Sequence, residues 1–377
     1  MNGTNFGIES FYFYFFFFLI FFVLGCQGLF AKSSQRKQFF LACFSLLYLM
    51  AALRGITVGG DLKRYLPEFH SVSLSSFQYI IEFGRHESGY LIYIKLLSLI
   101  SSAERCFLVG TSLASLVGPF YLFYRYSKCP VASILLYYAM GYYTNTFNNV
   151  RQSIAISIIF CVIPYLLDRK MWKYIIGVLL ATTFHYSALV MLIVYPLINK
   201  PIDTKKLLVY AGVGLGVVGV FGYFFLSYVA ETFLTRFDPE SFMEEGEGPG
   251  YGLFFFYVII FLLISSFYIY QKDKMNSNQC KMMSLFVVFQ MFAMIIQLSA
   301  PIHHSMVRMT YYFFIPIVTI GVPYIGSYII KRNRVVFYLP IFVFAIYYMI
   351  RVYSRAPEYM TNSQGVIPYI LIETPIF

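Results

Sequence analysis

The sequence has few charged side chains for its length. Of its 377 residues, 12% are charged and 59% are hydrophobic, whereas soluble domains carry about 25% charged residues. This composition excludes an ordinary soluble domain. It predicts an all-α polytopic membrane protein, in which residues 1–377 form a single integral membrane domain.

Cysteine is also scarce, and the six cysteines follow no pairing pattern. The chain has no CxxC and no Cys/His spacing of the kind that binds zinc, so we expect free thiols, no structural metal and no cofactor. A basic stretch and a small-residue cleavage site are both missing around the apolar segment 11–24, which predicts that this segment is not a cleavable signal.

Long apolar segments are abundant, and about ten have the length of a full transmembrane helix. They fall at about 11–30, 38–54, 106–125, 131–147, 151–168, 207–230, 251–270, 282–300, 309–330 and 335–352. A further stretch, 174–198, breaks at Phe184-His185-Tyr186-Ser187 into pieces too short to span, which predicts a broken helical hairpin with His185 near its turn. Residues 89–101 are short and interrupted by Lys95, so we expect an outer-face or partly dipping helix there.

The distribution of charge predicts the orientation. Six short loops hold 17 of the 28 Lys and Arg residues but 3 of the 17 Asp and Glu residues, and basic loops lie in the cytoplasm. Both termini are then outside, as are the loops 55–105 and 231–250 and the C-terminal tail 353–377. The net charge of +11 is a topology signal and gives no reason to expect a nucleic-acid partner.

This orientation brings isolated polar residues to the outer face. They are Arg54, Asp61, Arg64, Arg85, His86, Glu87, Arg151, His185, His303, His304, Arg308 and Arg351. Arg151 is the most informative, because no acidic residue lies within fifteen positions and its neighbours Asn148, Asn149 and Gln152 are amides. An arginine beside lipid is costly, which predicts an anion-binding site; the alternative is an interfacial arginine that snorkels to water.

Several other members of this group have a chemical and a plain structural interpretation. Asp61 could cap a helix and pair with Arg64, or be part of an ordinary loop helix. The triplet at 85–87 combines a cation, an imidazole and a carboxylate, although exposed loops often carry such triplets. His185 at a helix break suits proton transfer, or it bonds a backbone carbonyl at the turn.

Arginines that face a lipid-accessible cavity favour a diphosphate as the ligand. Guanidinium groups bind phosphate oxygens bidentately and stay charged. A polyprenyl diphosphate would also explain why the site opens toward lipid.

The sequence resembles the EpsG/Wzy family of polysaccharide polymerases. The pieces that match are Gly60-Asp61-Leu62-Lys63-Arg64-Tyr65, Asn149-Val150-Arg151-Gln152-Ser153-Ile154-Ala155, Phe184-His185-Tyr186-Ser187-Ala188-Leu189, Arg308 and Val366-Ile367-Pro368-Tyr369. The resemblance implies a metal-independent, lipid-donor glycosyltransferase of GT-C-like architecture in the bacterial inner membrane, with its active site facing the periplasm. It also implies undecaprenyl-diphosphate-linked oligosaccharides as donor and acceptor, membrane lipids around the chain, and a flippase and a chain-length regulator as partners.

We therefore expect an inverting glycosyl transfer with polyprenyl diphosphate as the leaving group. Candidate residues are His185, Asp61 and Glu87 for catalysis, Arg151, Arg308, Arg54 and Arg85 for the diphosphate, and Asn148, Asn149, Gln152, Arg64, Tyr65, Tyr186, His303 and His304 for the acceptor or other parts of the substrate. His185 is the first choice as the base. The alternatives are a flippase for the same lipid-linked sugar, an O-antigen ligase or a membrane O-acyltransferase.

Overall fold

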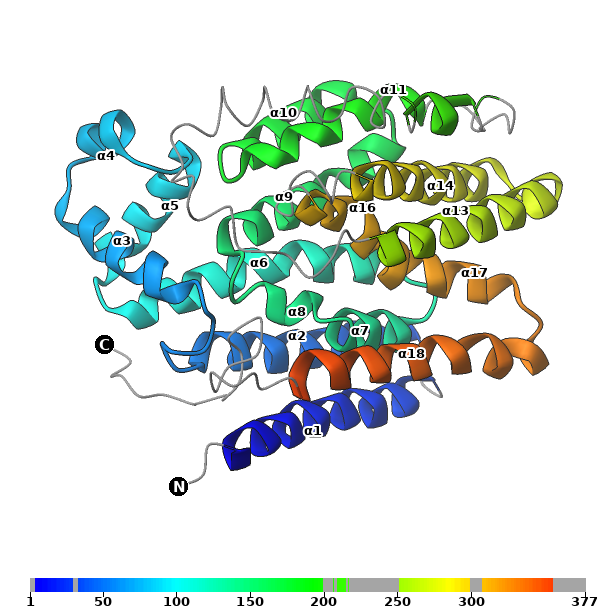
Figure 1. Cartoon of the computed structure of the whole chain (residues 1–377), viewed down its shortest axis with the longest axis horizontal. Helices are drawn as coiled ribbons and strands as arrows, with labels where there is room; N and C mark the ends of the chain where they lie inside the picture. Colours follow the sequence, from blue (N-terminus) through cyan, green and yellow to red (C-terminus); the bar gives the residue numbers. More distant parts are fainter. Residues whose placement is uncertain are drawn as a thin grey trace. The chain divides into compact units, whose positions relative to one another are not determined.

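The computed structural model describes residues 4–29, 33–198, 206, 209–214, 216, 251–298 and 307–354. Over these ranges the regular elements are all helices, with no strand (Figure 1). The predicted all-α class is therefore confirmed. The expected outer loop 231–250, the tail 353–377 beyond Ser354, and His303 and His304 lie outside the described residues.

Seven helices of the described ranges are long and apolar enough to cross a membrane. They are Gln35–Leu53, Glu104–Tyr126, Val150–Leu167, Gly252–Lys274, Ser277–Gln297, Arg308–Tyr328 and Lys331–Ile350. Each corresponds to one apolar segment predicted from the sequence, and the chain is a multi-pass membrane protein. The predicted segment 207–230 lies almost wholly outside the described residues, so the total of ten spans stays a prediction.

One predicted span is not a continuous helix. The segment 131–147 forms two short helices, α7 (Pro130–Ala139) and α8 (Tyr142–Asn145). Between them Gly141 has a φ of 72°, the left-handed conformation that ends a helix and that glycine adopts readily. Hydropathy alone could not detect this break, because the residues on both sides of Gly141 are apolar or aromatic.

The broken hairpin forms as the sequence predicts. Helix α10 (Met171–Thr182) ends before His185, and the chain continues as the 3₁₀ helix η1 (Tyr186–Ile193) and α11 (Val194–Leu197). The hydroxyl of Tyr174 donates to the carbonyl of Met191 at 2.7 Å, which ties the two arms together.

The chain divides into two compact units. The first comprises residues 1–163, 176–188 and 318–377, and the second comprises 164–175 and 189–317. In the first unit, α2 (Ser33–Leu53) packs on α6 (Glu104–Tyr126), while α1 (Thr4–Leu29) packs on α2, α7 and α18 (Arg334–Ser354). In the second, α13 (Tyr251–Gln271) packs on α14 (Ser277–Gln297), which also packs on η4 (Arg308–Thr310) and α16 (Tyr311–Pro316). The remaining elements are η3 (Lys272–Lys274), the π-helical turn η5 (Ile317–Gly321), α17 (Val322–Tyr328) and η6 (Lys331–Asn333).

Three helices between α2 and α6 build the part of the first unit that carries the candidate site. They are α3 (Leu62–Leu74), α4 (Phe77–Phe83) and α5 (Ser88–Ile100). Their apolar faces share one buried cluster with the N-terminal turns of α6 and of α9 (Val150–Leu167), including Phe69, Tyr90 and Phe107. Helix α5 has 13 residues, fewer than the ~20 that a normal span needs, and its depth in the membrane stays a prediction.

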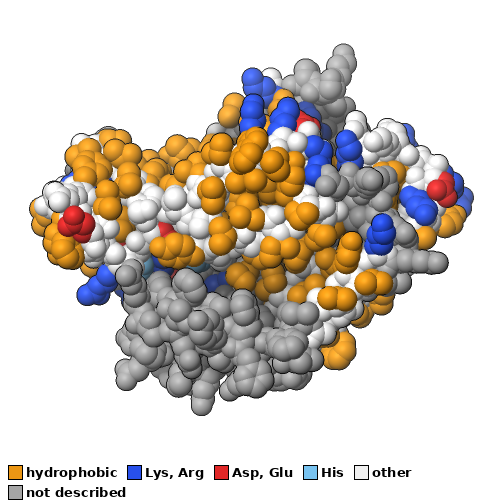
Figure 2. Space-filling model, turned by 90° about the horizontal axis from the view of Figure 1, so that it is seen from above, with side chains coloured by type: hydrophobic (Ala, Val, Ile, Leu, Met, Phe, Trp, Pro, Cys, Tyr) orange, Lys and Arg blue, Asp and Glu red, His pale blue; other side chains and the backbone are white. Residues whose placement is uncertain are grey.

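Much of the exposed surface is hydrophobic, as the face drawn in Figure 2 shows. In the 18-residue apolar windows of the spans at Gly252–Lys274 and Lys331–Ile350, 28% and 11% of the residues are buried by the protein itself. Apolar surface of this extent needs a non-aqueous environment, which for these helices is lipid.

Candidate functional site

Two polar side chains of the first unit, Arg151 on α9 and His185 after α10, meet at the carboxylate of Glu87, which is 2% exposed. One oxygen, Oε2, accepts a hydrogen bond from Nη1 of Arg151 at 2.5 Å. The other, Oε1, lies 3.0 Å from Nδ1 of His185 and accepts from the backbone N–H of Tyr186 at 3.3 Å. Two residues that the sequence predicts to be functional are thus joined by a third.

The local backbone explains why Glu87 reaches His185. The N–H of Tyr90 in the first turn of α5 donates to the carbonyl of Thr183, just after α10, at 3.2 Å. A Cβ at Gly89 would lie 2.1 Å from the hydroxyl oxygen of Thr183, so this approach needs a residue without a side chain. The close contact fixes Glu87, at the start of α5, against the break that carries His185.

Arg151 has the carboxylate partner that its sequence neighbourhood lacks. The prediction of an arginine with no carboxylate partner is wrong, because Glu87, 64 positions away, forms an ion pair with it. The guanidinium also lies 6.0 Å from the ring centre of Tyr90 and neighbours Tyr65. Arg151 is the second residue of α9, so its charge adds to the positive end of the helix dipole, and both favour an anion there.

A second carboxylate–imidazole pair lies beside the first. Oε1 of Glu68, on α3, is 3.5 Å from Nε2 of His86. Glu68 is not among the residues that the sequence pattern predicts to be functional. It lies three residues after the buried Tyr65 and next to the buried Phe69, at the edge of the apolar face of α3. A carboxylate at the edge of the apolar face of a helix is the sequence feature that could have identified Glu68 as a candidate.

The two carboxyl groups have opposite pKa shifts. Burial acts to raise the pKa of Glu87, but the hydrogen bond from His185 and the charge of Arg151 outweigh it and lower the pKa to about 2. Burial raises the pKa of Glu68 to about 7, against the opposing charge of Arg151. Burial and the charge of Arg151 lower the pKa of His86 to about 4. Near neutral pH, Glu87 is ionised, His86 is neutral and Glu68 exchanges a proton.

The ionised state of Glu87 decides the tautomer of His185. A carboxylate can only accept hydrogen bonds, so Nδ1 of His185 carries the hydrogen that points to Glu87. In the neutral ring, Nε2 then holds the lone pair and can accept a proton. This carboxylate–imidazole arrangement is suited to general-base catalysis.

Four buried polar atoms of this cluster have no hydrogen-bond partner among the described residues. They are Oε2 of Glu68, Nδ1 of His86, the hydroxyl of Tyr90 and Nε of Arg151. Buried polar atoms are nearly always paired in folded proteins, and exceptions mark functional or ligand-binding positions. The cluster can therefore bind a ligand with both donor and acceptor groups.

Arg54 is placed differently from what the sequence predicts. Its side chain is buried, with the residue 1% exposed, and donates to the carbonyls of Ala51 and Val58 at 2.5 and 3.1 Å and to the hydroxyl of Ser112 at 3.2 Å. Its guanidinium carbon also lies 4.4 Å from the ring centre of Phe147. These contacts place Arg54 in the architecture of the loop after α2, and its role at a diphosphate stays a prediction.

The same loop makes a tight turn at Gly59. Gly59 has a φ of 119°, and a Cβ there would lie 2.8 Å from the carbonyl oxygen of Phe147. Asp61 occupies the N-cap position of α3 without a side-chain capping bond, and its backbone N–H donates to Oδ1 of Asn148 at 3.5 Å. No ion pair joins Asp61 to Arg64 in the described part of the chain.

The remaining predicted residues have varied surroundings. Arg64, Arg85 and Tyr186 are exposed, Tyr65 and Gln152 are buried, and Nδ2 of Asn149 donates to Oδ1 of Asn145 at 2.7 Å. Arg308 is exposed at the start of η4, in the second unit. No group of three or more His, Cys, Asp or Glu side chains within the described ranges could hold a metal ion.

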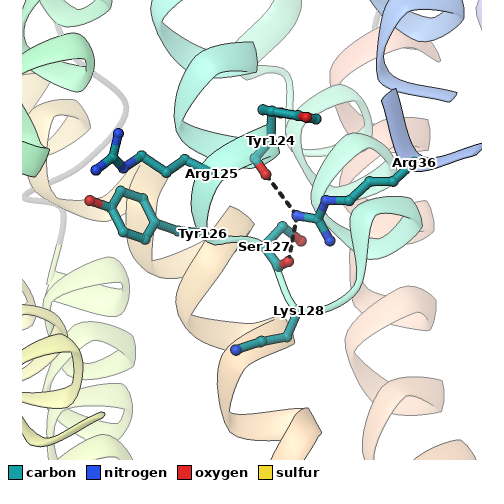
Figure 3. A pocket seen from close by; sticks show the side chains of 6 residues that line it. All are labelled: Arg36, Tyr124, Arg125, Tyr126, Ser127 and Lys128. Atoms are coloured by element: carbon teal, nitrogen blue, oxygen red, sulfur yellow. Dashed lines mark hydrogen bonds between the residues drawn. The ribbon is translucent and has the colours of Figure 1, made fainter. Parts of the chain in front are cut away.

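An open pocket of about 480 Å³ lies elsewhere in the first unit (Figure 3). It is lined by Arg36, Tyr124, Arg125, Tyr126, Ser127 and Lys128. Arg36 is at the start of α2 and the others are at the end of α6, opposite to the helix ends that carry Arg54 and Arg105. Arg36 donates to the carbonyls of Tyr124 and Ser127 at 2.8 and 2.9 Å, so it caps α6 and is distinct from the Glu87 cluster.

Comparisons with known proteins test the family resemblance found in the sequence. No solved structure matches the chain. The chain is 24% identical over 187 residues to the amylovoran biosynthesis protein AmsC of Erwinia amylovora, a match that covers 48% of this chain and 50% of AmsC. The chain thus spans about half the length of this curated relative. The family model of the EpsG family matches residues 37–371, a range that includes Glu68, Glu87, Arg151 and His185, and the chain belongs to the EpsG family.

Proposed function

We propose that this protein is a polysaccharide polymerase, a membrane glycosyltransferase that joins lipid-linked oligosaccharide repeats. Membership of the EpsG family and the similarity to an amylovoran biosynthesis protein support this class of function. The observation that carries the proposal is the buried carboxylate of Glu87, which holds a cation and an imidazole together. A cation for a phosphate leaving group and a base for a sugar hydroxyl are the two groups that such a transfer requires.

In the proposed reaction, Nε2 of His185 takes the proton of an acceptor hydroxyl. Glu87 stays ionised and stabilises the imidazolium through its contact with Nδ1. The acceptor oxygen forms a bond to the anomeric carbon of the donor as the bond from that carbon to the diphosphate oxygen breaks. The diphosphate leaves with the electron pair, and a single displacement inverts the anomeric configuration.

Arg151 stabilises the leaving diphosphate in this proposal. A guanidinium has five N–H donors; Nη1 bonds Glu87, and the Tyr65 hydroxyl also hydrogen-bonds the guanidinium. Nε is buried without a partner among the described residues, which leaves donors for phosphate oxygens. Arg85 and Arg64 are exposed on the same unit and add positive charge, and Arg308 stays a candidate for the same role.

The same proposal includes the lipid carrier, the side of the membrane and the partner proteins. The lipid is a polyprenyl diphosphate such as undecaprenyl diphosphate, and the reaction takes place at the outer face of the bacterial inner membrane. A flippase would deliver the repeat, and a chain-length regulator would limit the product. The concentration of Lys and Arg in the six short loops supports this orientation.

The test is reconstitution of the full chain in vesicles with a lipid-linked repeat. A ladder of longer lipid-linked glycans is expected. His185→Gln should slow its synthesis about 10²- to 10⁴-fold, the usual contribution of a general base. Glu82→Gln, on the exposed α4, is the matched control and should leave the rate unchanged. Movement of the repeat across the membrane without a ladder would support a flippase, and transfer to a different acceptor would support a ligase.

A further inference from the structure

We propose that Gly89 is a positioning residue of the reaction. Its lack of a side chain lets the start of α5 hold the helix break at residues 183–186 in the conformation that presents His185 to Glu87. This inference rests on the proposed function and deepens it, because it names what assembles the base. It starts from the backbone contact between α5 and the break.

The break bonds the start of α5 on both sides of His185. Before His185, the carbonyl of Thr183 accepts from the N–H of Tyr90 at 3.2 Å. After it, the N–H of Tyr186 donates to Oε1 of Glu87 at 3.3 Å, the same oxygen that lies 3.0 Å from Nδ1 of His185. The imidazole is therefore oriented by two hydrogen bonds that its neighbours in the chain make to α5.

Gly89 lies at the closest point of this contact. A Cβ there would lie 2.7 Å from the Cβ and 2.9 Å from the carbonyl oxygen of Thr183, with the hydroxyl oxygen closer still. Ordinary contacts of a Cβ begin at 3.4 Å, and rotation of the Thr183 side chain moves neither of the first two atoms. Gly89 does not have a positive φ, so space and not backbone conformation requires glycine here. Any larger residue must push the two segments apart by several tenths of an ångström.

The break, and not α5, is the segment that would move. Helix α5 packs against α3, α4 and α6, and its residues Tyr90 and Ile94 are buried. The break is less enclosed, since Tyr186 is 64% exposed. The bond from Arg151 to Glu87 joins α9 to the start of α5 and does not involve the break. A larger residue at position 89 therefore separates the imidazole from Glu87 and leaves the arginine in place.

The two groups of the proposed reaction then respond differently. His185 takes the proton during the transfer, and a displacement of about 1 Å in a reacting group can lower a rate about 10²-fold. Arg151 binds the diphosphate before and during the transfer, so its contribution to KM remains. Loss of positioning at Gly89 should lower kcat with little change in KM.

Gly177 offers the matched control on the same arm of the hairpin. It lies on α10, and a Cβ there would lie 3.0 Å from the Cβ of Val162 on α9 and closer to a methyl group of that side chain. Gly177→Ala therefore also forces a close contact apart, but away from α5. A general loss of packing in the hairpin would affect both glycine variants alike.

The kinetic experiment measures kcat and KM for the lipid-linked repeat in vesicles. Gly89→Ala should lower kcat about 10- to 100-fold and change KM less than about threefold. Thr183→Gly keeps the carbonyl that accepts from Tyr90 but removes the Cβ and the hydroxyl. Thr183→Gly alone should be somewhat slow, because glycine loosens the break, yet in combination with Gly89→Ala it should restore much of the lost kcat. Gly177→Ala should keep the wild-type kcat per folded molecule.

A spectroscopic measurement tests the same contact without synthesis. The hydrogen of the neutral His185 ring lies on Nδ1 because Glu87 accepts it, whereas a free imidazole side chain prefers the hydrogen on Nε2. In ¹⁵N-histidine NMR at pH 8, the His185 signals, assigned by their loss in His185→Gln, should report Nδ1–H in the wild type and in Gly177→Ala. Gly89→Ala should shift them toward the Nε2–H form.

The outcomes separate this inference from the proposed function. If wild-type vesicles make no ladder, the proposed function is wrong, while NMR still tests whether Gly89 holds His185 on Glu87. If the wild type makes a ladder and Gly89→Ala keeps its kcat and its tautomer, the role of Gly89 alone is wrong. The role is also wrong if Gly177→Ala is equally slow or if Thr183→Gly restores nothing. Should Gly89→Ala fail to fold, the double variant must fold and make the ladder, and its failure would contradict the inference.

Discussion

Arg54 and Arg151 look alike in the sequence and differ in what surrounds them. Each lies at the end of an apolar segment, and each is largely removed from water. The hydrogen bonds of Arg54 go to two backbone carbonyls and a hydroxyl, which serve the loop itself. Arg151 bonds a carboxylate that also holds an imidazole. The partner of a buried arginine, more than its burial, therefore distinguishes an arginine that holds a loop from one with a candidate role in the reaction.

Between the two arginines, the larger effect is expected from Arg151→Met. Ladder synthesis should fall about 10²- to 10³-fold, the usual loss when one charge-stabilising donor is removed. The variant should also lose stability, by about 3–5 kcal/mol, because Glu87 is left buried without its cation. Thermal unfolding in detergent and ladder assays in vesicles measure the two losses separately.

The double variant Arg151→Met with Glu87→Gln separates these two causes. It removes the unpaired charge, so most of the stability should return while synthesis stays low. If synthesis returned with stability, Arg151 would be a structural residue like Arg54, and the contrast between the two arginines would be wrong.

Arg54→Met should give the reverse result at a smaller scale. The variant loses its bonds to the two carbonyls and the hydroxyl, and a hydrogen bond to a charged group contributes about 1.5–3 kcal/mol. The free energy of unfolding should fall by about that amount. Ladder synthesis per folded molecule should stay within about threefold of the wild type. A folded Arg54→Met that is as inactive as Arg151→Met would place Arg54 in the site.

The contrast also explains what could be predicted from the sequence. His185 was identifiable because the apolar pattern breaks at its position, and the spans were identifiable because lipid requires long apolar helices. Neither pattern reports a partner 64 residues away, so Arg151 looked as if it had no carboxylate partner and Arg54 looked equivalent to it. Glu68 was missed for the same reason, since its importance depends on His86 across the α3–α5 contact.

The break at Gly141 was missed for a different reason. Hydropathy averages over a window, whereas a single left-handed residue ends a helix. Backbone conformation at one glycine and contacts between distant segments are therefore the two features that the pattern of residue types did not contain.

The pH dependence of stability should separate the two carboxyl groups near Arg151. An unperturbed Glu titrates near pH 4.3, so the lowered pKa of Glu87 contributes stability above that pH, which is lost as the pH falls from about 4 through 2. The raised pKa of Glu68 acts in the opposite sense: stability is lost as the pH rises from about 4.3 through 7.

Glu68→Gln should therefore be more stable than the wild type at pH 8, by about 3–4 kcal/mol, and equal to it near pH 4. Glu87→Gln should be less stable at pH 7 and approach the wild type near pH 3. Urea unfolding in mild detergent at these pH values measures both differences. A Glu68→Gln variant that is destabilised at pH 8 would mean that its carboxylate is a stabilising partner of Arg151 and not a proton-exchanging group.

The smallest effect is expected at the exposed His70–Glu104 pair. Solvent screens an ion pair of this kind, which contributes about 0–1 kcal/mol, and its side chains are 50% and 26% exposed. His70→Asn should change the free energy of unfolding by less than about 1 kcal/mol, and moderate salt should remove the difference. His86→Asn, in the less exposed pair, should change the free energy of unfolding more than His70→Asn, because Glu68 loses the partner of a carboxyl group that is 18% exposed. If His70→Asn lowered the free energy of unfolding as much as His86→Asn, exposure to solvent would not be what distinguishes the two pairs.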